Sequence, residues 1–433
     1  MKIRALLINP WIYDFSAHNL WAMPLGLFKV AEYLSQYDVE LSYIDCLKIN
    51  KTRQYNTGKY AYKVITTPDI IGSIRRRFKV YGITEEEFVS RLRMSMPLDI
   101  IFITTVMSYW YIGAKRAIEL IREICGDIPI VLGGIYATLY PEHALSQCNP
   151  CAVCIGRAED SLKIIIESFG FKLRRIKDSP TSYYKLNIYS KYPYAPVLTS
   201  YGCPFRCIYC ASHILNGSYT QRDQDDVLEE IIEFYNHGVM DIAFYDDALL
   251  YNSENHIKPI LRYISEKGLT IRLHTPNGLH CRFIDDELAY LFRRSGFRTI
   301  RLGYETFNKQ RQMDTGGKTT DSDLVTAIRH LKGNGFEKRD IGVYLMYGLP
   351  HQELKEVKQG IEFLMGLGVQ IRLTEYSPIR GTEAWRSLVD SGIIDDELDP
   401  LLTNNSIFSE MYSNYDADEV KRLKWLVKEY NNS

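Results

Sequence analysis

The sequence predicts an α/β protein in which a doubly wound N-terminal domain is followed by a six-strand partial (β/α) barrel. Short apolar runs alternate with amphipathic helical patterns along most of the chain, which is typical of parallel strands covered by helices. The 433 residues exceed what one hydrophobic core usually serves. A proline-containing connector at 171–195 divides the alternation into two series. We therefore predict domains at 1–170 and 196–381, followed by a C-terminal tail at 382–433.

The first series contains five short apolar runs and three helical patterns. The runs predict buried parallel strands at 3–8, 39–44, 100–104, 128–132 and 152–155, and the helical patterns lie at 25–37, 114–125 and 161–169. This order of elements is typical of a doubly wound, Rossmann-like sheet. A segment at about 47–97 interrupts the alternation. Because Thr84 and Glu87 have capping-box spacing, we predict a helical insertion there.

The second series contains six apolar runs separated by five helical patterns. The predicted strands lie at 197–200, 242–245, 270–274, 299–302, 341–344 and 371–375, and the predicted helices at 226–237, 254–267, 285–295, 321–334 and 356–367. Six strands and the helices between them form a partial barrel, smaller than the eight-fold one. In such barrels the functional site lies at the carboxyl ends of the strands.

The composition limits the class of partner and the compartment. The net charge of −1 argues against nucleic acid as the dominant partner, and 46% hydrophobic with 24% charged residues is typical of a globular protein. No apolar stretch reaches the ~20 residues of a membrane-spanning helix, and the first apolar run is too short for a signal peptide. Nine cysteines, an odd number, favour a reducing compartment. We therefore expect a cytoplasmic protein without a membrane partner.

Three cysteines form the most informative motif. Cys203, Cys207 and Cys210 follow the first predicted barrel strand with C-x3-C-x2-C spacing. Three thiolates in one tight loop can each bind a different iron of a [4Fe–4S] cluster and leave the fourth iron open for another ligand. Zinc usually takes four ligands in two separated pairs, and no matching fourth ligand follows nearby. Coincidental core cysteines are the remaining alternative.

The spacing, with Tyr209 directly before the last cysteine, resembles the radical S-adenosylmethionine (SAM) superfamily. The resemblance implies that the open iron binds the amino and carboxylate groups of SAM. An electron from the cluster would then cleave SAM to methionine and a 5′-deoxyadenosyl radical, which abstracts hydrogen from a substrate. It also implies an electron donor such as flavodoxin or ferredoxin. The substrate, a small molecule or a peptide, does not follow from the sequence.

The resemblance implies SAM contacts at successive strand ends. These residues are Tyr209, Tyr245, Asp246, Asp247, Asn277, Gly303, Glu305, Ser377 and Pro378. Carboxylates suit the ammonium and ribose hydroxyls of SAM, and glycines let the backbone approach it closely. The family's Gly-Gly-Glu mark is replaced here by Tyr245-Asp246-Asp247. His213 and Asn216, just past the cysteine loop, are further candidates to face the site.

The form Tyr245-Asp246-Asp247 resembles the sequence found at this position in the branch of the superfamily that carries an N-terminal cobalamin-binding-type domain. Three N-terminal segments also resemble that branch: Met23-Pro24-Leu25-Gly26-Leu27, the run from Val131 to Thr138, and Gly156-Arg157-Ala158-Glu159. The resemblance implies that Gly133 and Gly134 lie close to a bound cobalamin, if one is present. The branch's frequent cobalt-ligating histidine motif is absent, because Asp45-Cys46-Leu47-Lys48 stands near the expected place.

Three functions remain open on the sequence. With cobalamin, the resemblance implies methyl transfer to an unactivated carbon. Without it, the radical would drive a rearrangement, cleavage or oxidation. The third alternative is a non-catalytic iron–sulfur or corrinoid sensor, which the recurring strand-end marks disfavour.

A second cysteine group has two alternative interpretations. Cys148, Cys151 and Cys154 have C-x2-C-x2-C spacing, which suggests an auxiliary cluster. However, Cys151 and Cys154 would point to opposite faces of the predicted strand at 152–155. Buried free cysteine is also an ordinary core residue, so we favour core positions for this group.

Overall fold

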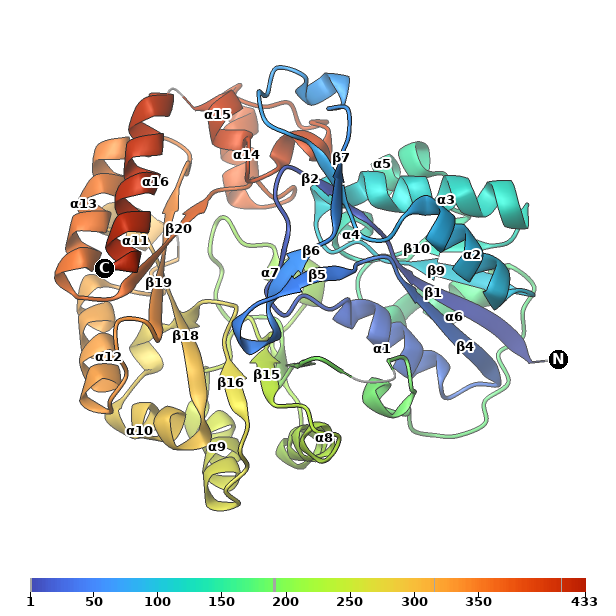
Figure 1. The fold of residues 1–433 in the computed structure, drawn as a ribbon, viewed down its shortest axis with the longest axis horizontal. Helices are drawn as coiled ribbons and strands as arrows, with labels where there is room; N and C mark the ends of the chain where they lie inside the picture. Colours follow the sequence, from blue (N-terminus) through green and yellow to red (C-terminus); the bar gives the residue numbers. More distant parts are fainter. Residues whose placement is uncertain (1, 190–191, 315, 414) are drawn as a thin grey trace. The chain divides into compact units, whose positions relative to one another are not determined.

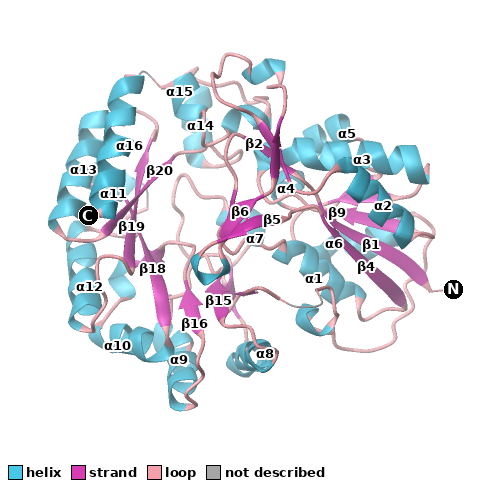
Figure 2. Cartoon of the chain, viewed as in Figure 1, coloured by secondary structure: helices cyan, strands magenta, loops and turns pink. Residues whose placement is uncertain are grey.

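The computed structural model describes residues 2–189, 192–314, 316–413 and 415–433. It divides into two compact units. Unit 1 comprises Met1–Lys191 with Leu398–Asn404, and unit 2 comprises Tyr192–Glu397 with Asn405–Ser433. Each unit contains a sheet of parallel strands with helices between them (Figure 1, Figure 2). The predicted fold class is therefore confirmed.

Unit 1 is built on a five-stranded parallel sheet. Its order is β11 (Ala152–Val153), β10 (Ile130–Leu132), β9 (Ile100–Ile103), β1 (Ile3–Asn9) and β4 (Val39–Asp45). The intervening helices are α1 (Leu25–Leu34), α3 (Tyr111–Cys125), α4 (Ile135–Leu139), α5 (Pro141–Cys148) and α6 (Ala158–Ser168). The strand order reverses between β1 and β9, which creates a topological switch point. Ligands of doubly wound sheets bind outside the carboxyl ends of the strands at such a point.

The insertion at 47–97 contains short strands besides the predicted helix, so the prediction of a helical insertion is only partly correct. It forms β5 (Ile49–Thr52), β6 (Gly58–Tyr60), β7 (Tyr62–Val64) and β8 (Lys79–Tyr81), which pair among themselves and with β2 (Ile12–Asp14) and β3 (His18–Asn19). Buried Gly58 and Tyr60 flank exposed Lys59, and this period of two is that of a strand. The cap at Thr84 is confirmed. Thr84 is the N-cap residue of α2 (Glu85–Ser95), and its hydroxyl accepts a hydrogen bond from the Glu87 backbone N–H.

A C-terminal segment belongs to unit 1. Leu398–Asn404 contains the 3₁₀ turn η7 (Pro400–Thr403). The Asn404 amide donates to Asp14 Oδ1 at 3.0 Å, and the Tyr111 hydroxyl donates to Asp399 Oδ2 at 3.1 Å. Residues 190 and 191 of the predicted connector lie outside the described residues.

Unit 2 contains the six parallel strands predicted for the partial barrel. Their order is β12 (Ala195–Val197), β15 (Asp241–Phe244), β16 (Arg272–His274), β18 (Phe297–Glu305), β19 (Ile341–Tyr347) and β20 (Gln370–Glu375), and β17 (Leu279–His280) also pairs with β18. The helices between them are α8 (Gln224–Asn236), α9 (Ile257–Glu266), α10 (Asp286–Ser295), α11 (Lys309–Asp314), α12 (Asp321–Gly333) and α13 (Leu354–Gly366). β12 and β20 are the edges of this sheet, so the barrel is open.

Shorter elements complete unit 2. They are β13 (Ser200–Tyr201), α7 (Ser212–Asn216), β14 (Thr220–Gln221), α14 (Glu383–Asp390), α15 (Phe408–Tyr412) and α16 (Ala417–Asn432). In the part of the chain that the structure describes, no helix is long and apolar enough to cross a membrane.

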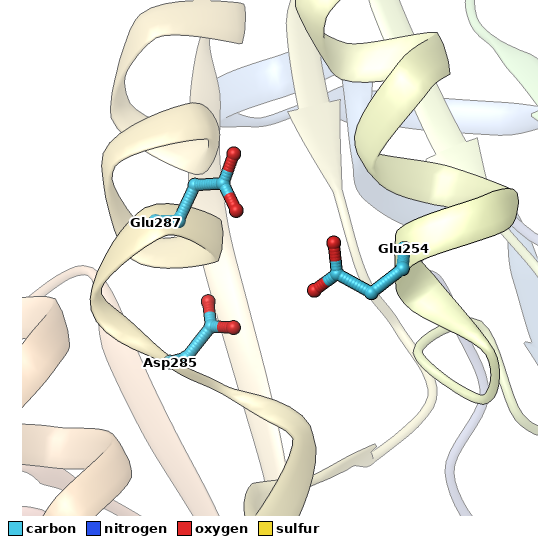
Figure 3. A group of neighbouring side chains, drawn as sticks. All are labelled: Glu254, Asp285 and Glu287. Carbon is cyan, nitrogen blue, oxygen red and sulfur yellow. The ribbon is translucent and has the colours of Figure 1, made fainter.

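Three carboxylates on the surface of unit 2 surround one lysine. Glu254, Asp285 and Glu287 have carboxylate oxygens within 4.8 Å of one another (Figure 3). The Lys258 ammonium pairs with all three, at 2.8 Å from Asp285 and 2.9 Å from Glu287. Burial alone would lower the pKa of Lys258, but hydrogen bonds to the three carboxylates raise it overall. The group is therefore an ion-pair cluster centred on the Lys258 ammonium, which binds all three carboxylates.

We expect Lys258→Met to lower the free energy of unfolding by about 1 kcal/mol, because the aliphatic stem is kept and only the ion pairs are lost. Urea denaturation of the variant measures this change. Lys267→Met, at an exposed lysine next to α9, is the matched control. An unchanged midpoint for Lys258→Met would mean that the ion pairs contribute nothing.

Candidate functional site

The cysteine loop begins at the carboxyl end of the first barrel strand. β12 ends at Val197, and Cys203 follows β13. The Cys210 backbone N–H donates to the Cys207 carbonyl at 3.0 Å, which closes a tight turn between two of the cysteines. A Cβ at Gly316 would lie 3.2 Å from Cys207 Cα, and Gly316 has φ +107°. Only glycine fits comfortably there, so the loop around Gly316 packs directly on the cysteine loop.

The three thiols share a partly buried environment. Burial raises the pKa of Cys203 to about 11 and also raises the pKa of Cys207 and Cys210. Since metals bind the thiolate, cluster binding must release these protons. The nearby Lys318 ammonium acts in the opposite direction on Cys207 and Cys210, because a positive charge favours thiolates. Three thiols with an adjacent cation fit an anionic iron–sulfur cluster.

Asp246 holds the start of the cysteine loop. Its buried carboxylate accepts from the Thr199 backbone N–H at 3.0 Å, the Thr199 hydroxyl at 2.7 Å and the Ser200 hydroxyl at 2.6 Å. Three donors from the segment that leads into Cys203 therefore converge on one carboxylate. The geometry gives Asp246 a structural task that the sequence did not reveal, and its SAM contact stays a prediction.

Asp247 and Asn277 also bind protein groups around the loop. Asp247 Oδ2 accepts from Ser212 Oγ at 2.5 Å and from the Asn216 amide at 3.1 Å, so it anchors α7. The Asn277 amide donates to the Tyr245 carbonyl at 2.7 Å, which ties the ends of two neighbouring strands together. These residues are brought to one edge of the sheet, as predicted from their positions at strand ends.

Two glycines allow close packing between strand ends. A Cβ at Gly278 would lie 3.0 Å from Gly303 Cα, and a Cβ at Gly303 would lie 3.2 Å from Glu305 Oε1 and 3.4 Å from Lys318 Nζ. Side chains at either position would therefore collide with the site. The two glycines therefore allow the strand ends and the Glu305 and Lys318 side chains to pack closely.

Glu305 and Lys318 form a buried ion pair beside the cysteines. Lys318 Nζ lies 3.0 Å from Glu305 Oε1 and 5.7 Å from the centre of the Tyr209 ring. Burial disfavours the ammonium, but Glu305, Tyr209 and Cys207 raise the pKa of Lys318 overall. Glu305 has φ +70°, and a non-glycine residue in the left-handed region carries a cost of about 1–2 kcal/mol. Such strain is typical of functional sites.

Two hydroxyl groups at the site are buried without a hydrogen-bond partner among the described residues. They belong to Tyr209, in the cysteine loop, and Tyr376, directly after β20. Ser377 and Pro378 follow Tyr376 in the same irregular segment. Buried hydroxyls normally find partners, so these two indicate a missing polar ligand or water.

Sequence reasoning missed Lys318 and His280. Lys318 follows Gly316-Gly317, and this glycine pair after a short helix was the available signal. The centre of the His280 ring lies 4.6 Å from that of Phe205, which stands between Cys203 and Cys207 in the sequence. The His280 Nδ1 atom is buried without a hydrogen-bond partner among the described residues. Burial lowers the pKa of His280 to about 3, so the imidazole is neutral. No sequence signal distinguished it from an ordinary core histidine.

The carboxyl edge of the unit 1 sheet has open and apolar positions. A Cβ at Gly133 would meet only Cys154, at 3.7 Å and beyond, whereas one at Gly134 would lie 2.3 Å from the Thr105 carbonyl. Gly133 therefore borders free space and Gly134 is needed for packing. Val106 and Ile155, which follow β9 and β11, are 36% and 51% exposed at this edge.

In the segment 45–48, where the related branch often has a cobalt-ligating histidine, the side chains of Asp45 and Cys46 contact the protein interior. Asp45 accepts from the Asn9 amide at 2.9 Å and from the Tyr189 hydroxyl at 2.7 Å. Cys46 is fully buried, and burial raises the pKa of its thiol. Neither side chain is free to bind an external metal.

The second cysteine group has three separate environments. Cys148 Sγ lies 3.9 Å from the Tyr136 hydroxyl, Cys151 accepts from Arg122 at 3.0 Å, and Cys154 Sγ lies 3.4 Å from Ser161 Oγ. Cys151 is exposed whereas Cys148 and Cys154 are buried. These surroundings favour the interpretation as ordinary cysteines.

Comparison with known proteins places this geometry in a family. Residues 197–364 match the model of the radical SAM superfamily. An uncharacterised methyltransferase of Pyrococcus horikoshii is 24% identical over 331 residues, covering 68% of this chain and 70% of that protein. The chain covers only 52% of a second relative, the ribosomal protein uS12 methylthiotransferase RimO of Clostridium botulinum, at 26% identity.

Two solved structures share the two-unit fold. TsrM of Kitasatospora setae, a radical S-adenosylmethionine methyltransferase with bound tryptophan and a SAM analogue, gives a TM-score of 0.67 at 16% identity over 90% of this chain and 76% of its own. OxsB, a cobalamin-dependent radical enzyme with bound aqua-cobalamin, gives a TM-score of 0.55 at 14% identity over 90% of this chain and 55% of its own.

The fold and the cysteine loop define an enzyme with a radical-generating barrel. Residues 197–364 therefore resemble the radical SAM superfamily, whose members use a [4Fe–4S] cluster and SAM. The fold of the chain is similar to the folds of TsrM and OxsB.

Proposed function

We propose that this chain is a cobalamin-dependent radical SAM methyltransferase. The observation that carries the radical chemistry is the three-cysteine loop beside the closely packed Gly278 and Gly303 and the Glu305–Lys318 pair. The methyl-transfer part is supported by the fold shared with TsrM and OxsB and by the name of the Pyrococcus relative.

The residues of unit 2 fit a cluster and SAM. Cys203, Cys207 and Cys210 would hold three irons, and the bound cluster would supply the electron that cleaves SAM. Glu305 would accept from the ammonium or ribose hydroxyls, since carboxylates pair best with charged donors. The unpartnered Tyr209 hydroxyl would donate to the cofactor or to an ordered water. A reductant such as flavodoxin or ferredoxin would restore the cluster.

Unit 1 fits a flat corrin ring at the carboxyl edge of its sheet, beside β9, β10 and β11. Gly133 leaves space there, and Val106 and Ile155 offer exposed apolar surface at the same edge. Because Asp45 and Cys46 are engaged or buried, this loop would leave the lower face of cobalt without a protein ligand. Bound cobalamin would supply the methyl group.

The absence of a ligand at 45–48 also favours a second candidate, a radical enzyme without cobalamin. The corrinoid content of protein purified without oxygen from cobalamin-fed cells distinguishes the two. Near one corrinoid per chain supports methyl transfer. None, together with a full cluster and 5′-deoxyadenosine formation, rejects cobalamin. Absence of 5′-deoxyadenosine despite an intact cluster would instead support the sensor.

We expect Gly133→Val to lower corrinoid content while the fold is kept. The new side chain enters free space in the unliganded fold but occupies the proposed ring site. A steric misfit of about 1–3 kcal/mol corresponds to a roughly tenfold to hundredfold loss of affinity. Gly366→Val, at an open glycine of α13, is the control. Equal corrinoid retention by both variants would place the cofactor elsewhere or reject it.

A further inference from the structure

Two arginines meet on the inner face of the barrel sheet. Arg301 lies on β18 and is paired in register with Gly342 of β19, while Arg372 of β20 is paired with Tyr344. A Cβ at Gly342 would lie 2.7 Å from Arg301 Nη1, so the guanidinium extends across this glycine toward β20. Since side chains alternate along a strand, Arg301 shares the face of Gly303.

These two guanidinium groups lack a carboxylate. Arg301 Nη1 donates only weakly to the neighbouring Ile300 carbonyl at 3.3 Å. Arg372 Nη2 donates to Gln370 Oε1 at 2.6 Å, and its Nε is buried without a partner. Among the described residues, none forms an ion pair with either arginine within 4.0 Å.

Other cations of the same barrel are paired. Arg272 lies 2.5 Å and 2.7 Å from the two oxygens of Asp241, and Lys318 lies 3.0 Å from Glu305. Burial lowers the pKa of Arg301 to about 10, and the positive charge of Arg372 lowers it further. Burial also lowers the pKa of Arg372. Two like charges held together in a partly buried place are unfavourable unless an anion joins them.

We propose that Arg301 and Arg372, with Tyr344 between them, bind the carboxylate or phosphate group of an organic anion that is the substrate. This inference rests on the proposed function, in which the barrel holds the radical site. Two planar guanidinium groups suit the bidentate recognition of either group. Gly342 has no side chain, and this leaves room for Arg301 to reach the shared site.

The position of the arginines separates this site from the cofactor. Arg301 comes four residues before Glu305, which corresponds to about 13 Å along β18 at the usual rise per residue. The amino and carboxylate groups of SAM would lie at the cysteine loop, beyond the carboxyl end of the strands. The substrate anion would therefore lie deeper in the barrel, with its reacting carbon directed back toward the cofactor.

Anion binding is measured by calorimetry on the anaerobic holoenzyme saturated with SAM. The probes are benzoate, phenyl phosphate and the neutral benzamide. The variants are Arg301→Met, Arg372→Met, the double variant, and Arg298→Met, an exposed arginine of the same strand, as the matched control. Gly342→Ala keeps both arginines but displaces Arg301, and it replaces the arginine variants if these do not fold. SAM affinity is measured for every protein.

We expect the wild type to bind one or both anions but not benzamide. Each arginine variant should bind the anion roughly tenfold to a hundredfold more weakly, which is the range for a charge-assisted hydrogen bond. Arg298→Met should match the wild type, and SAM affinity should be unchanged throughout. The preferred probe then shows whether the substrate group is a carboxylate or a phosphate.

Three outcomes would overturn the inference. They are wild-type affinities that do not distinguish anions from benzamide, anion affinities that survive in the double variant, and a loss of SAM affinity in the double variant. The last result would identify the cofactor's own carboxylate as the anion. Because binding is measured without turnover, a failure of methyl transfer or the absence of corrinoid leaves this test readable.

Discussion

Cys207→Ala is expected to reduce 5′-deoxyadenosine formation to background and to remove most iron and sulfide from the purified protein. Two remaining thiols leave a second iron without a protein ligand, so the cluster is no longer held in one defined position. The fold should survive, because Cys207 is a small buried side chain whose truncation costs about 1 kcal/mol of a typical 5–15 kcal/mol stability. Iron analysis, the visible spectrum and product chromatography measure these effects.

The control is Cys151→Ala, which removes an exposed cysteine of unit 1. This variant should keep the full cluster and full activity, since Cys151 contacts Arg122 rather than the cysteine loop. Normal activity of Cys207→Ala would contradict the cluster assignment. A loss of cluster in Cys151→Ala would instead give the second cysteine group a role in cofactor binding.

The parallel strands were predictable because buried strands and amphipathic helices have distinct periods. Five of the six predicted strands of unit 2 coincide with observed strands except at their ends, for example at 371–375 against β20. The prediction at 197–200 overlaps β12 only at Val197. The insertion was not predictable in the same way. Its strands are only three or four residues long, and their pairing with β2 and β3 joins segments that are distant in sequence.

The site was predictable where residues follow strand ends and not where it depends on loop packing. The positions of Asp246, Asp247, Asn277 and Glu305 at one edge follow from the parallel sheet. Lys318 comes from a loop whose approach to Cys207 depends on the conformation of Gly316, which no periodicity encodes. The two unpaired arginines were likewise invisible, because a lack of partners appears only once every neighbour is placed.

The role of Asp246 also depends on packing around the loop. We expect its substitution to lower the stability of the protein and not only its affinity for the cofactor. Asp246→Ala leaves the buried Thr199 backbone N–H and the hydroxyls of Thr199 and Ser200 without their acceptor. Each unsatisfied buried group costs about 1–3 kcal/mol, so the free energy of unfolding should fall by roughly 3 kcal/mol or more. Since these donors lead directly into Cys203, cluster content should fall with it. Denaturant unfolding and iron analysis test both expectations.

Asp247→Ala and Asp246→Asn separate an anchoring role from a cofactor contact. Asp247 is half-buried and binds only two side-chain donors, so its removal should cost less stability. Asp246→Asn keeps one carbonyl acceptor but loses the charge, and it should recover part of the stability lost in Asp246→Ala. If Asp246 instead acts mainly on SAM, all of these proteins would unfold like the wild type and keep their cluster. Only the dissociation constant for SAM would then rise, and the convergence of three buried donors on this carboxylate would have no measurable role.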